Sequence, residues 1–500
     1  KEDKYFGACT MLVTMPGLPM IGHGQIEGFA EKYGMEYNRP YWDETVDLDL
    51  VGRHEREIFP LMRKRHVFSD VSHFLLFDFL TPGPGVNENV FAYFNRAGDE
   101  AALVAFNNKF EHAAGWIHTS AAYAVRGPDQ EISLAKRTLG EALDLHYNEN
   151  NYCLFRDEIT GLEYIRNSKD ILERGLYFEL GAYKYCVFSG FSEVQDDALR
   201  RYHDLEARLL GRGVDSISEA LKEILLRPLL TAFESILNPK SVNQVLKQVR
   251  EKKTSTKDLH DFEIGCLDFL TQAKRFSSGE GDPKLFAKAV SKKLGTALKL
   301  PELLDRLSAT ENDDTAQRFD SLSQDASFAV CLLLGWLLLH QIGRLTDSVD
   351  AAEESCKLTT DWLLEKPFAG TLRELGGSEA LVADGRVLLR ILLREQNWFV
   401  DLVQGKPEKH KVLARLFETQ DVRHFLEVNQ YEEVFWYKKE KLEILVDWLH
   451  LIAAIQLSCS SMPKNKRVTA LSTVSSMAKT WLAASRTSGY QLEKLLELNA

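Results

Sequence analysis

The spacing of hydrophobic residues changes twice along the chain and divides it into three regions. Residues 1–65 combine a helical face with a short apolar run. Residues 66–191 contain short segments in which apolar and polar positions alternate, and residues 192–500 repeat apolar positions every three to four residues. Since alternation is typical of strands and a period of 3.6 of helices, the pattern predicts a multi-domain α+β protein with a large all-α C-terminal region.

The first region predicts a helix, a turn, a strand and a polar loop. Phe6, Cys9 and Val13 share one helix face, and residues 15–28 predict a tight turn, a short buried strand and a glycine-rich exit. A polar, aromatic loop over residues 28–46 then leads into another helix. A strand that opens at its C-terminal end into a polar loop is how a (β/α)8 barrel builds its active-site face. We therefore expect residues 1–65 to be the C-terminal end of such a barrel, with strand eight and the last helix.

The second region predicts two hairpins among its short strands. Residues 90–94 and 101–106 flank one turn, and residues 152–156 and 162–165 flank another. Several short strands separated by turns indicate antiparallel sheets packed as a sandwich, so residues 66–191 predict a β-sandwich domain.

The third region predicts helices throughout, without a regular repeat period. The helices are expected to break at residues 238–239, 277–283, 300–301, 376–377 and 462–463. A polar stretch is the best candidate for a boundary, so the region is expected to divide near residues 308–326.

Charge and cysteine content exclude several classes of protein. The net charge is −12, which argues against a nucleic-acid partner or a polybasic membrane surface. The seven cysteines are scattered and form no C-x-x-C pair, a usage that fits free thiols in a reducing cytoplasm. The longest apolar run, Phe328 to Leu339, has twelve residues, and a bilayer span needs about 20. We therefore expect a cytoplasmic protein without a membrane partner.

A glycine-rich motif in the first region carries a resemblance to a known family. Its residues are Gly17, Pro19, Ile21, Gly24, Glu27 and Gly28. The motif resembles the eighth barrel strand of the α-amylase superfamily, glycoside hydrolase family 13. The helix ending in residues 59–65 resembles the last barrel helix, which in this family leads into a β-sandwich. The resemblance covers about residues 1–190. It departs from the family in the motif, because residues 22–27 replace the usual Tyr-Tyr-Gly-Asp/Glu-Glu and displace the acid by one position.

The resemblance implies an enzyme that hydrolyses or transfers α-glucosidic bonds with retention of configuration. The resemblance implies that the catalytic residues are an Asp on strand four, a Glu on strand five and an Asp on strand seven. All three would precede Lys1. We therefore expect no catalytic residue, metal or cofactor in this segment, and no activity from it alone. The string nearest to the strand-seven motif, Leu259-His260-Asp261, lies in the helical region.

Five residues are candidates for contact with the substrate, an α-glucan or oligosaccharide. Gln25 and Glu27 leave the predicted strand at its active-site end, where they would bind a sugar hydroxyl or anchor the loop. His23 would line the wall of the site. Tyr37 and Trp42 belong to a set of loop aromatics, with Tyr33 and Tyr41, that would stack on glucose rings or pack the loop onto the barrel.

A second class of function stays open: a non-catalytic carbohydrate- or protein-binding module. The helical region, about 300 residues long, is much larger than this family's sandwich usually carries. The sequence contains no Walker loop, no G-x-G-x-x-G after a strand, no H-E-x-x-H and no G-x-S-x-G motif. The role of the helical region and its protein partner remain open.

Overall fold

A computed structural model of the chain describes residues 2–31, 41–83, 85–126, 132–251, 253–299, 326–405 and 412–499. The chain is a mixed α+β protein and divides into two compact units, Lys1–Leu225 and Leu226–Ala500. The division falls within helix α8 (Ile217–Ile236). Residues 308–325 of the predicted internal boundary lie outside the described residues, so the three-domain division stays a prediction.

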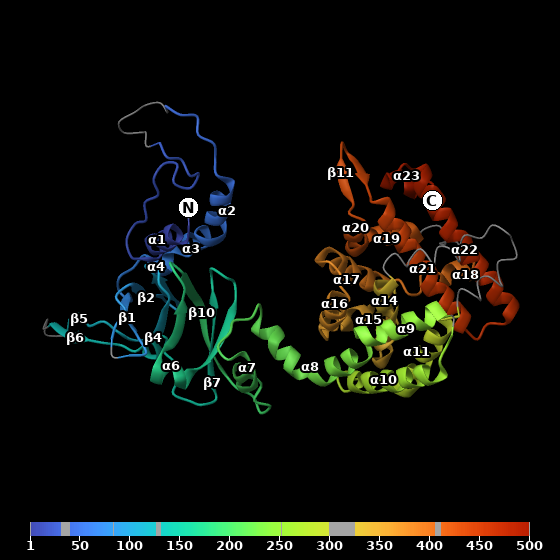
Figure 1. Cartoon of the computed structure of the whole chain (residues 1–500), viewed down its shortest axis with the longest axis horizontal. Helices are drawn as coiled ribbons and strands as arrows, with labels where there is room; N and C mark the ends of the chain where they lie inside the picture. The colour runs from blue at the N-terminus through green and yellow to red at the C-terminus, as the bar shows by residue number, and fades with distance from the viewer. Residues whose placement is uncertain are drawn as a thin grey trace. The chain divides into compact units, whose positions relative to one another are not determined.

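Before α8, the described residues of the first unit form four N-terminal helices, ten strands and three further helices (Figure 1). The helices are α1 (Asp3–Thr14), α2 (Leu48–Glu57), α3 (Phe59–Arg63), α4 (Arg65–Phe68), α5 (Leu139–Ala142), α6 (Ser168–Arg174) and α7 (Arg201–Leu209). The strands are β1 (Leu75–Leu80), β2 (Val90–Ala97), β3 (Glu100–Asn107), β4 (Ala113–Ser120), β5 (Tyr123–Arg126), β6 (Ile132–Ala135), β7 (Asn151–Asp157), β8 (Glu163–Asn167), β9 (Leu176–Leu180) and β10 (Tyr185–Gln195).

Eight of these strands form one antiparallel sheet in the order β8-β7-β10-β3-β2-β1-β4-β9. Both predicted hairpins are confirmed, as β2–β3 and β7–β8. The two-residue turn between β2 and β3 contains Gly98 at φ +59°. Such turns match the twist of a hairpin when their central residues have positive φ, which glycine adopts without a steric penalty.

The large sheet curls around its own hydrophobic core. The Phe178 ring on edge strand β9 lies 5.6 Å from the Phe188 ring on β10, although four strands separate β9 from β10 in the sheet. Leu139 of α5 and Ile171 of α6 join the same core. The predicted sandwich would need two sheets, whereas the described strands of this unit form one curled sheet and the separate β5–β6 hairpin. Because a strongly curled sheet encloses apolar side chains from several sides, short alternating strands do not distinguish it from a sandwich.

The other face of the sheet is covered by the N-terminal helices. Phe6, Cys9 and Val13 of α1 pack with Val104 of β3 and Val187 of β10 in a second core. The predicted helix face of residues 5–13 is therefore confirmed, and it seats α1 on the centre of the sheet.

The strand predicted within residues 15–22 is absent, and this prediction was wrong. The segment has no strand pairing, and the side chains of Leu18 and Met20 are 94% and 82% exposed. A strand needs a neighbour to satisfy its backbone N–H and C=O groups, and the described residues offer this segment none. The described part of residues 1–65 accordingly forms helices α1, α2 and α3 and the start of α4, without a strand.

In the residues that the structure describes, the second unit is helical apart from one short hairpin. Its helices are α8, α9 (Pro239–Glu251), α10 (Thr256–Lys274), α11 (Pro283–Ala297), α14 (Ala326–Leu339), the 3-10 helix η2 (Ile342–Leu345), α15 (Ala351–Asp361), α16 (Glu365–Glu374), α17 (Glu379–Arg394), α18 (Val400–Val403), α19 (Val412–Glu418), α20 (Gln420–Phe425), α21 (Lys439–Cys459), α22 (Lys464–Thr487) and α23 (Leu492–Glu497). Four of the five predicted breaks separate consecutive helices, and the fifth, at 300–301, lies outside the described residues. The hairpin of β11 (Asn429–Tyr431) and β12 (Val434–Trp436) was not predicted.

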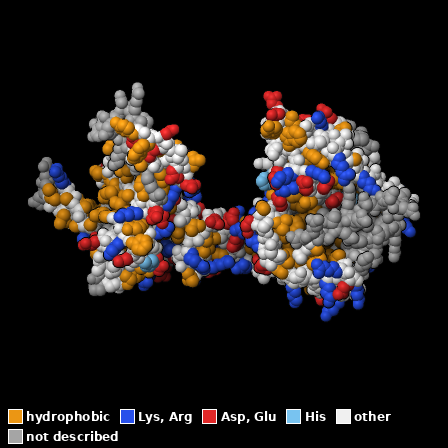
Figure 2. Space-filling view, turned by 45° about the horizontal axis from the view of Figure 1, so that its top comes forward, with side chains coloured by type: hydrophobic (Ala, Val, Ile, Leu, Met, Phe, Trp, Pro, Cys, Tyr) orange, Lys and Arg blue, Asp and Glu red, His pale blue; other side chains and the backbone are white. Residues whose placement is uncertain are grey.

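Two helical segments of this unit are long and apolar enough to cross a membrane, Ala326–Leu345 and Lys439–Cys459. Most of each segment lies inside the unit, because 72% of the most apolar stretch of the first and 67% of that of the second are buried. Both signs of charge are interspersed on the face of the unit seen in Figure 2.

All seven cysteines of the chain are free thiols, and only Cys459 is more than slightly exposed.

Candidate functional site

The predicted substrate loop leaves the end of α1 and returns at the start of α2, on the side of these helices away from the sheet (Figure 1). Its departure point is fixed by polar contacts to buried groups. The Tyr93 hydroxyl lies 2.6 Å from Oγ1 of Thr14, and the Asn95 amide donates to the Thr14 carbonyl at 3.2 Å. The Arg65 guanidinium donates to the Val13 carbonyl at 2.9 Å and also to the Gly17 carbonyl. The last turn of α1 therefore has partners for carbonyls that a helix end leaves unpaired.

The return point is an N-cap. The Asp47 carboxylate accepts a hydrogen bond from the Leu50 backbone N–H at 3.0 Å, and the Asp47 N–H donates to the Glu27 carbonyl at 2.9 Å. Asp47 is therefore the N-cap of α2. Gly28 has a φ of +86°, and a Cβ there would lie 3.1 Å from Cβ of Asp47, so glycine is needed where the two ends of the loop meet.

The Gln25 side chain forms its contacts within this turn and with α1. Its Oε1 accepts from the Gly22 N–H at 3.0 Å, and its Nε2 lies 3.8 Å from Sγ of Cys9. The Tyr5 hydroxyl donates to its carbonyl at 3.3 Å. Because both amide atoms have partners on this chain, the geometry favours a loop-anchoring role for Gln25 over contact with a sugar.

His23 and Glu27 lie on either side of Gln25 with different surroundings. His23 is exposed, and its ring centroid lies 6.4 Å from that of Phe29. Glu27 is half-buried. Between them, Gly24 is buried with φ +69°, and a Cβ there would approach Phe29 to 2.6 Å. The tight turn therefore presents His23 outward and keeps Phe29 against the backbone.

Two glutamates hold the base of the loop and were not predicted. The Glu31 carboxylate accepts from the backbone N–H groups of Tyr41 and Trp42 at 2.6 and 3.1 Å. The Glu44 carboxylate accepts from the N–H groups of Ala30 and Glu31 at 2.7 and 3.1 Å. Contacts ten to fourteen residues apart leave no periodic signal in a sequence, which is why pattern analysis missed them.

This clamp leaves the rings of Tyr41 and Trp42 largely in solvent, 74% and 63% exposed. Adjacent exposed aromatic rings on a held backbone can stack on the C–H face of a sugar. Of the other predicted aromatics, Tyr33 and Tyr37 lie outside the described residues. The structure therefore tests the placement of Trp42 but not that of Tyr37.

Behind the loop, a tyrosine and a histidine link α1 to α2. The Tyr5 hydroxyl lies 3.1 Å from Nε2 of His54, and Nδ1 of His54 lies 3.0 Å from the Leu50 carbonyl. His54 is buried, and burial raises the pKa of Tyr5 to about 12. The tyrosine is therefore neutral at physiological pH and acts as a hydrogen-bond donor that steadies the turn at Gln25.

The described loop residues can bind but hold no obvious catalytic pair. The carboxylates of Glu31, Glu44 and Asp47 are occupied by backbone N–H groups. Among the residues that the structure describes, no group of three or more His, Cys, Asp and Glu side chains is placed to hold a metal ion. The chain matches no family model, no curated protein and no solved structure.

Proposed function

We propose that this chain is the C-terminal part of an α-glucan-active enzyme of the α-amylase type, with residues 15–47 contributing to its substrate-binding face. The observation that carries the proposal is the pair of exposed apolar side chains Leu18 and Met20, 94% and 82% exposed, directly before the glycine-rich turn. An apolar segment held at both ends but left in water is suited to burial against a further part of the protein.

The proposed chemistry is retaining cleavage or transfer of an α-glucosidic bond. Such enzymes use one carboxylate as nucleophile and a second as general acid and base. Both would come from residues outside the 500 of this sequence. Within it, Trp42 would stack on a glucose ring, and His23 and Glu27 would face sugar hydroxyl groups.

The test compares the protein that contains this chain, isolated from its source, with residues 1–500 expressed alone. We expect the full protein to act on maltoheptaose with retention at the anomeric carbon, followed by NMR, and to form a covalent adduct with a 5-fluoro-glucosyl fluoride, detected by mass spectrometry. Residues 1–500 alone should show neither reaction. Absence of both reactions from the full protein would contradict the proposal.

Trp42 provides a test of the binding role. We expect Trp42→Ala to weaken the binding of maltoheptaose to the full protein about fivefold to tenfold, because a stacked aromatic contributes about 1 kcal/mol. Phe110→Ala is the matched control, since Phe110 is 78% exposed but lies in another loop, and it should leave the affinity unchanged. Equal affinities for wild type and Trp42→Ala would remove Trp42 from the site.

The alternative is a carbohydrate-binding module without catalysis, and the exposed Tyr41–Trp42 pair is compatible with it because stacking needs no carboxylate. Glucan binding by a full protein that gives neither product nor adduct would favour this alternative.

A further inference from the structure

A cavity of about 600 Å³ lies in the helical unit, far along the chain from the substrate loop. Its walls come from α10, α11, the end of α21 and the first turns of α22. The lining includes Leu259, Glu263, Lys288, Lys292, Lys299, Ser458, Lys464, Arg467, Val468 and Leu471. This volume is in the range of small-molecule sites, which are about 300–1,000 Å³.

Five cationic side chains and a single carboxylate line this cavity, in a chain whose net charge is −12. Two of the five cationic side chains form hydrogen bonds to backbone carbonyls. Lys292 Nζ donates to the Cys459 carbonyl at 3.1 Å, and Arg467 Nη1 donates to the Ser458 carbonyl at 3.4 Å. They bind carbonyls that the end of α21 leaves unpaired.

The other three cations are Lys288, Lys299 and Lys464, all exposed at the cavity. Among the described parts of the chain, none of the three forms an ion pair or a hydrogen bond. An ammonium group is a compact point charge that binds phosphate oxygens without demanding one fixed geometry. Three such groups at one cavity exceed what a single carboxylate ligand would need.

The start of α22 adds backbone donors to the same wall. This 24-residue helix begins at Lys464 after Pro463, and no side chain caps its first turn. Uncapped N–H groups at a helix N-terminus, with the positive end of the helix dipole, favour an anion. Lys464 and Arg467 belong to this first turn and line the cavity.

Besides the cations, the lining includes a serine and an apolar wall. Oγ of Ser458 is enclosed by the protein and has no hydrogen-bond partner within the described ranges, although Ser458 lines the cavity. Leu259, Val468 and Leu471 form an apolar wall beside the cations.

We propose that this cavity binds a phosphate ester that has an apolar or aromatic body. The phosphate lies among Lys288, Lys299, Lys464 and the first turn of α22, and the body lies on Leu259, Val468 and Leu471. A neutral glucan needs none of these charges, so the site is independent of the proposed α-glucan activity. The same chemistry is found in a mononucleotide and in an alkyl phosphate, and the experiment separates these two sources.

The experiment is calorimetric titration of the full chain with AMP and with dodecyl phosphate. Adenosine and dodecanol are the neutral counterparts, and inorganic phosphate is the probe without a body. We expect one of the two esters to bind at least about tenfold more tightly than both its neutral counterpart and inorganic phosphate, a difference of about 1.4 kcal/mol. Its affinity should fall as salt is raised, because exposed ammonium groups are screened.

The variants Lys288→Gln and Lys464→Gln should each weaken that binding about tenfold. Lys466→Gln is the matched control, since Lys466 is an exposed lysine in the same helical turn but does not line the cavity. Circular dichroism verifies that all three variants fold. The proposal is overturned if neither ester binds, if the neutral counterparts bind as tightly as the esters, or if Lys466→Gln weakens binding as much as Lys464→Gln.

Discussion

At the scale of single residues, the most unusual pair is a lysine buried beside a histidine in the helical unit. Lys293 Nζ lies 2.6 Å from Nε2 of His340, and His340 Nδ1 lies 3.0 and 2.9 Å from the carbonyls of Trp336 and Leu337. This geometry assigns the proton to Nδ1, which donates to a carbonyl, and leaves Nε2 to accept from Lys293. Burial, with Arg344 nearby, lowers the pKa of Lys293 to about 8 and holds the pKa of His340 well below its ordinary value of 6.5.

This pair predicts acid sensitivity of the helical unit. Below about pH 6.5 the unfolded chain protonates His340 while the folded chain does not, so the free energy of unfolding falls as the pH decreases. We expect His340→Gln, which keeps an acceptor for Lys293, to reduce this slope by up to about 1.4 kcal/mol per pH unit. Urea unfolding between pH 7 and about pH 5 measures the slope of the unfolding free energy against pH. Tryptophan fluorescence is a suitable probe, because six of the eight tryptophans lie in this unit. His112→Gln, at an exposed position, should retain the wild-type slope; equal slopes in all three proteins would refute the prediction.

In the β-rich unit, Gly115 is a residue whose replacement should be costly. A Cβ at this position of β4 would lie 2.2 Å from the backbone oxygen of Leu80 on the neighbouring strand. Since a paired backbone cannot move aside as a side chain can, we expect Gly115→Ala to cost about 2 to 3 kcal/mol of unfolding free energy. Gly83→Ala is the control, because nothing lies within 4 Å of a Cβ there. Hydrogen exchange of the β1 and β4 peptides should become faster only in Gly115→Ala; unchanged exchange would show that the sheet relaxes at little cost.

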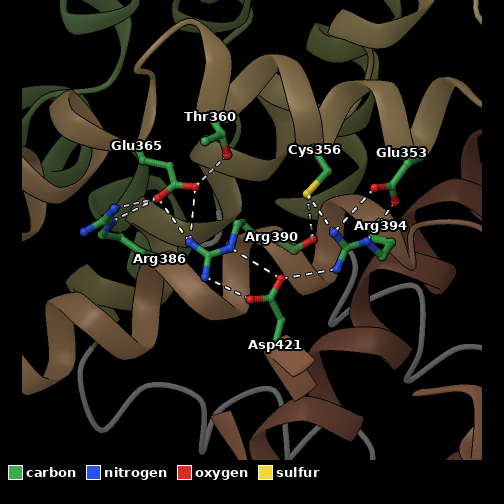
Figure 3. Close-up of polar contacts among 8 residues, drawn as sticks. All are labelled: Glu353, Cys356, Thr360, Glu365, Arg386, Arg390, Arg394 and Asp421. Carbon is green, nitrogen blue, oxygen red and sulfur yellow. Dashed lines mark hydrogen bonds and ion pairs between the residues drawn. The ribbon is translucent and has the colours of Figure 1, made fainter. Parts of the chain in front are cut away.

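At the scale of elements, α17 is joined to three neighbouring helices by a ladder of arginines. Figure 3 shows Arg386, Arg390 and Arg394 on one side of α17, four residues apart, facing carboxylates of α15, α16 and α20. The central member, Arg390, lies 3.2 Å from the Glu365 carboxylate and 2.9 Å from that of Asp421. The Glu365 side chain is only 7% exposed. Three arginines meet three acids, so the ladder is neutral and acts as a structural connection between helices.

Removal of the central arginine should uncouple these helices. We expect Arg390→Met to lower the free energy of unfolding by about 2 to 3 kcal/mol. Among the described residues, it leaves the buried Glu365 with one ion-pair partner, Arg386, beside the Thr360 hydroxyl, and it leaves Asp421 paired with Arg394. The control is Arg373→Met, which breaks an ion pair with Glu379 whose side chains are 50% and 77% exposed. That pair should contribute less than about 1 kcal/mol. Similar losses in both variants, measured by urea unfolding, would show that burial of Glu365 has no special energetic role.

The sequence predicts elements well where the signal is local and fails where partners are distant. The hairpins predicted at residues 90–106 and 152–165 are confirmed, because turn residues and alternation act within a few positions. The strand predicted at residues 15–22 failed because pairing depends on neighbours that no local pattern supplies. In the candidate site, Trp42 was predicted as one of four loop aromatics that would stack on a sugar or pack the loop, and its exposure came from the structure. The Glu31 and Glu44 clamp was missed, since it depends on how the loop closes.

At the scale of the whole molecule, the two compact units have separate hydrophobic cores. The large helical core begins with Leu226 in α8 and takes its members from residues 226–495. The cores on the two faces of the curled sheet take theirs from residues 6–188. The one element common to both units is α8, whose N-terminal part packs near Tyr152. Separate cores are the condition under which parts of a chain unfold independently.

We therefore expect two calorimetric unfolding transitions, and the variants above assign them. Gly115→Ala should lower the midpoint of one transition only, and Arg390→Met should lower that of the other. In the double variant the two losses should add to within about 0.5 kcal/mol, as they do for distant sites without shared partners. If both variants instead shift a single common transition, α8 transmits stability between the units. In that case the cooperative unit is the whole chain, and ligand binding at the basic cavity would also stabilise the sheet that carries the substrate loop.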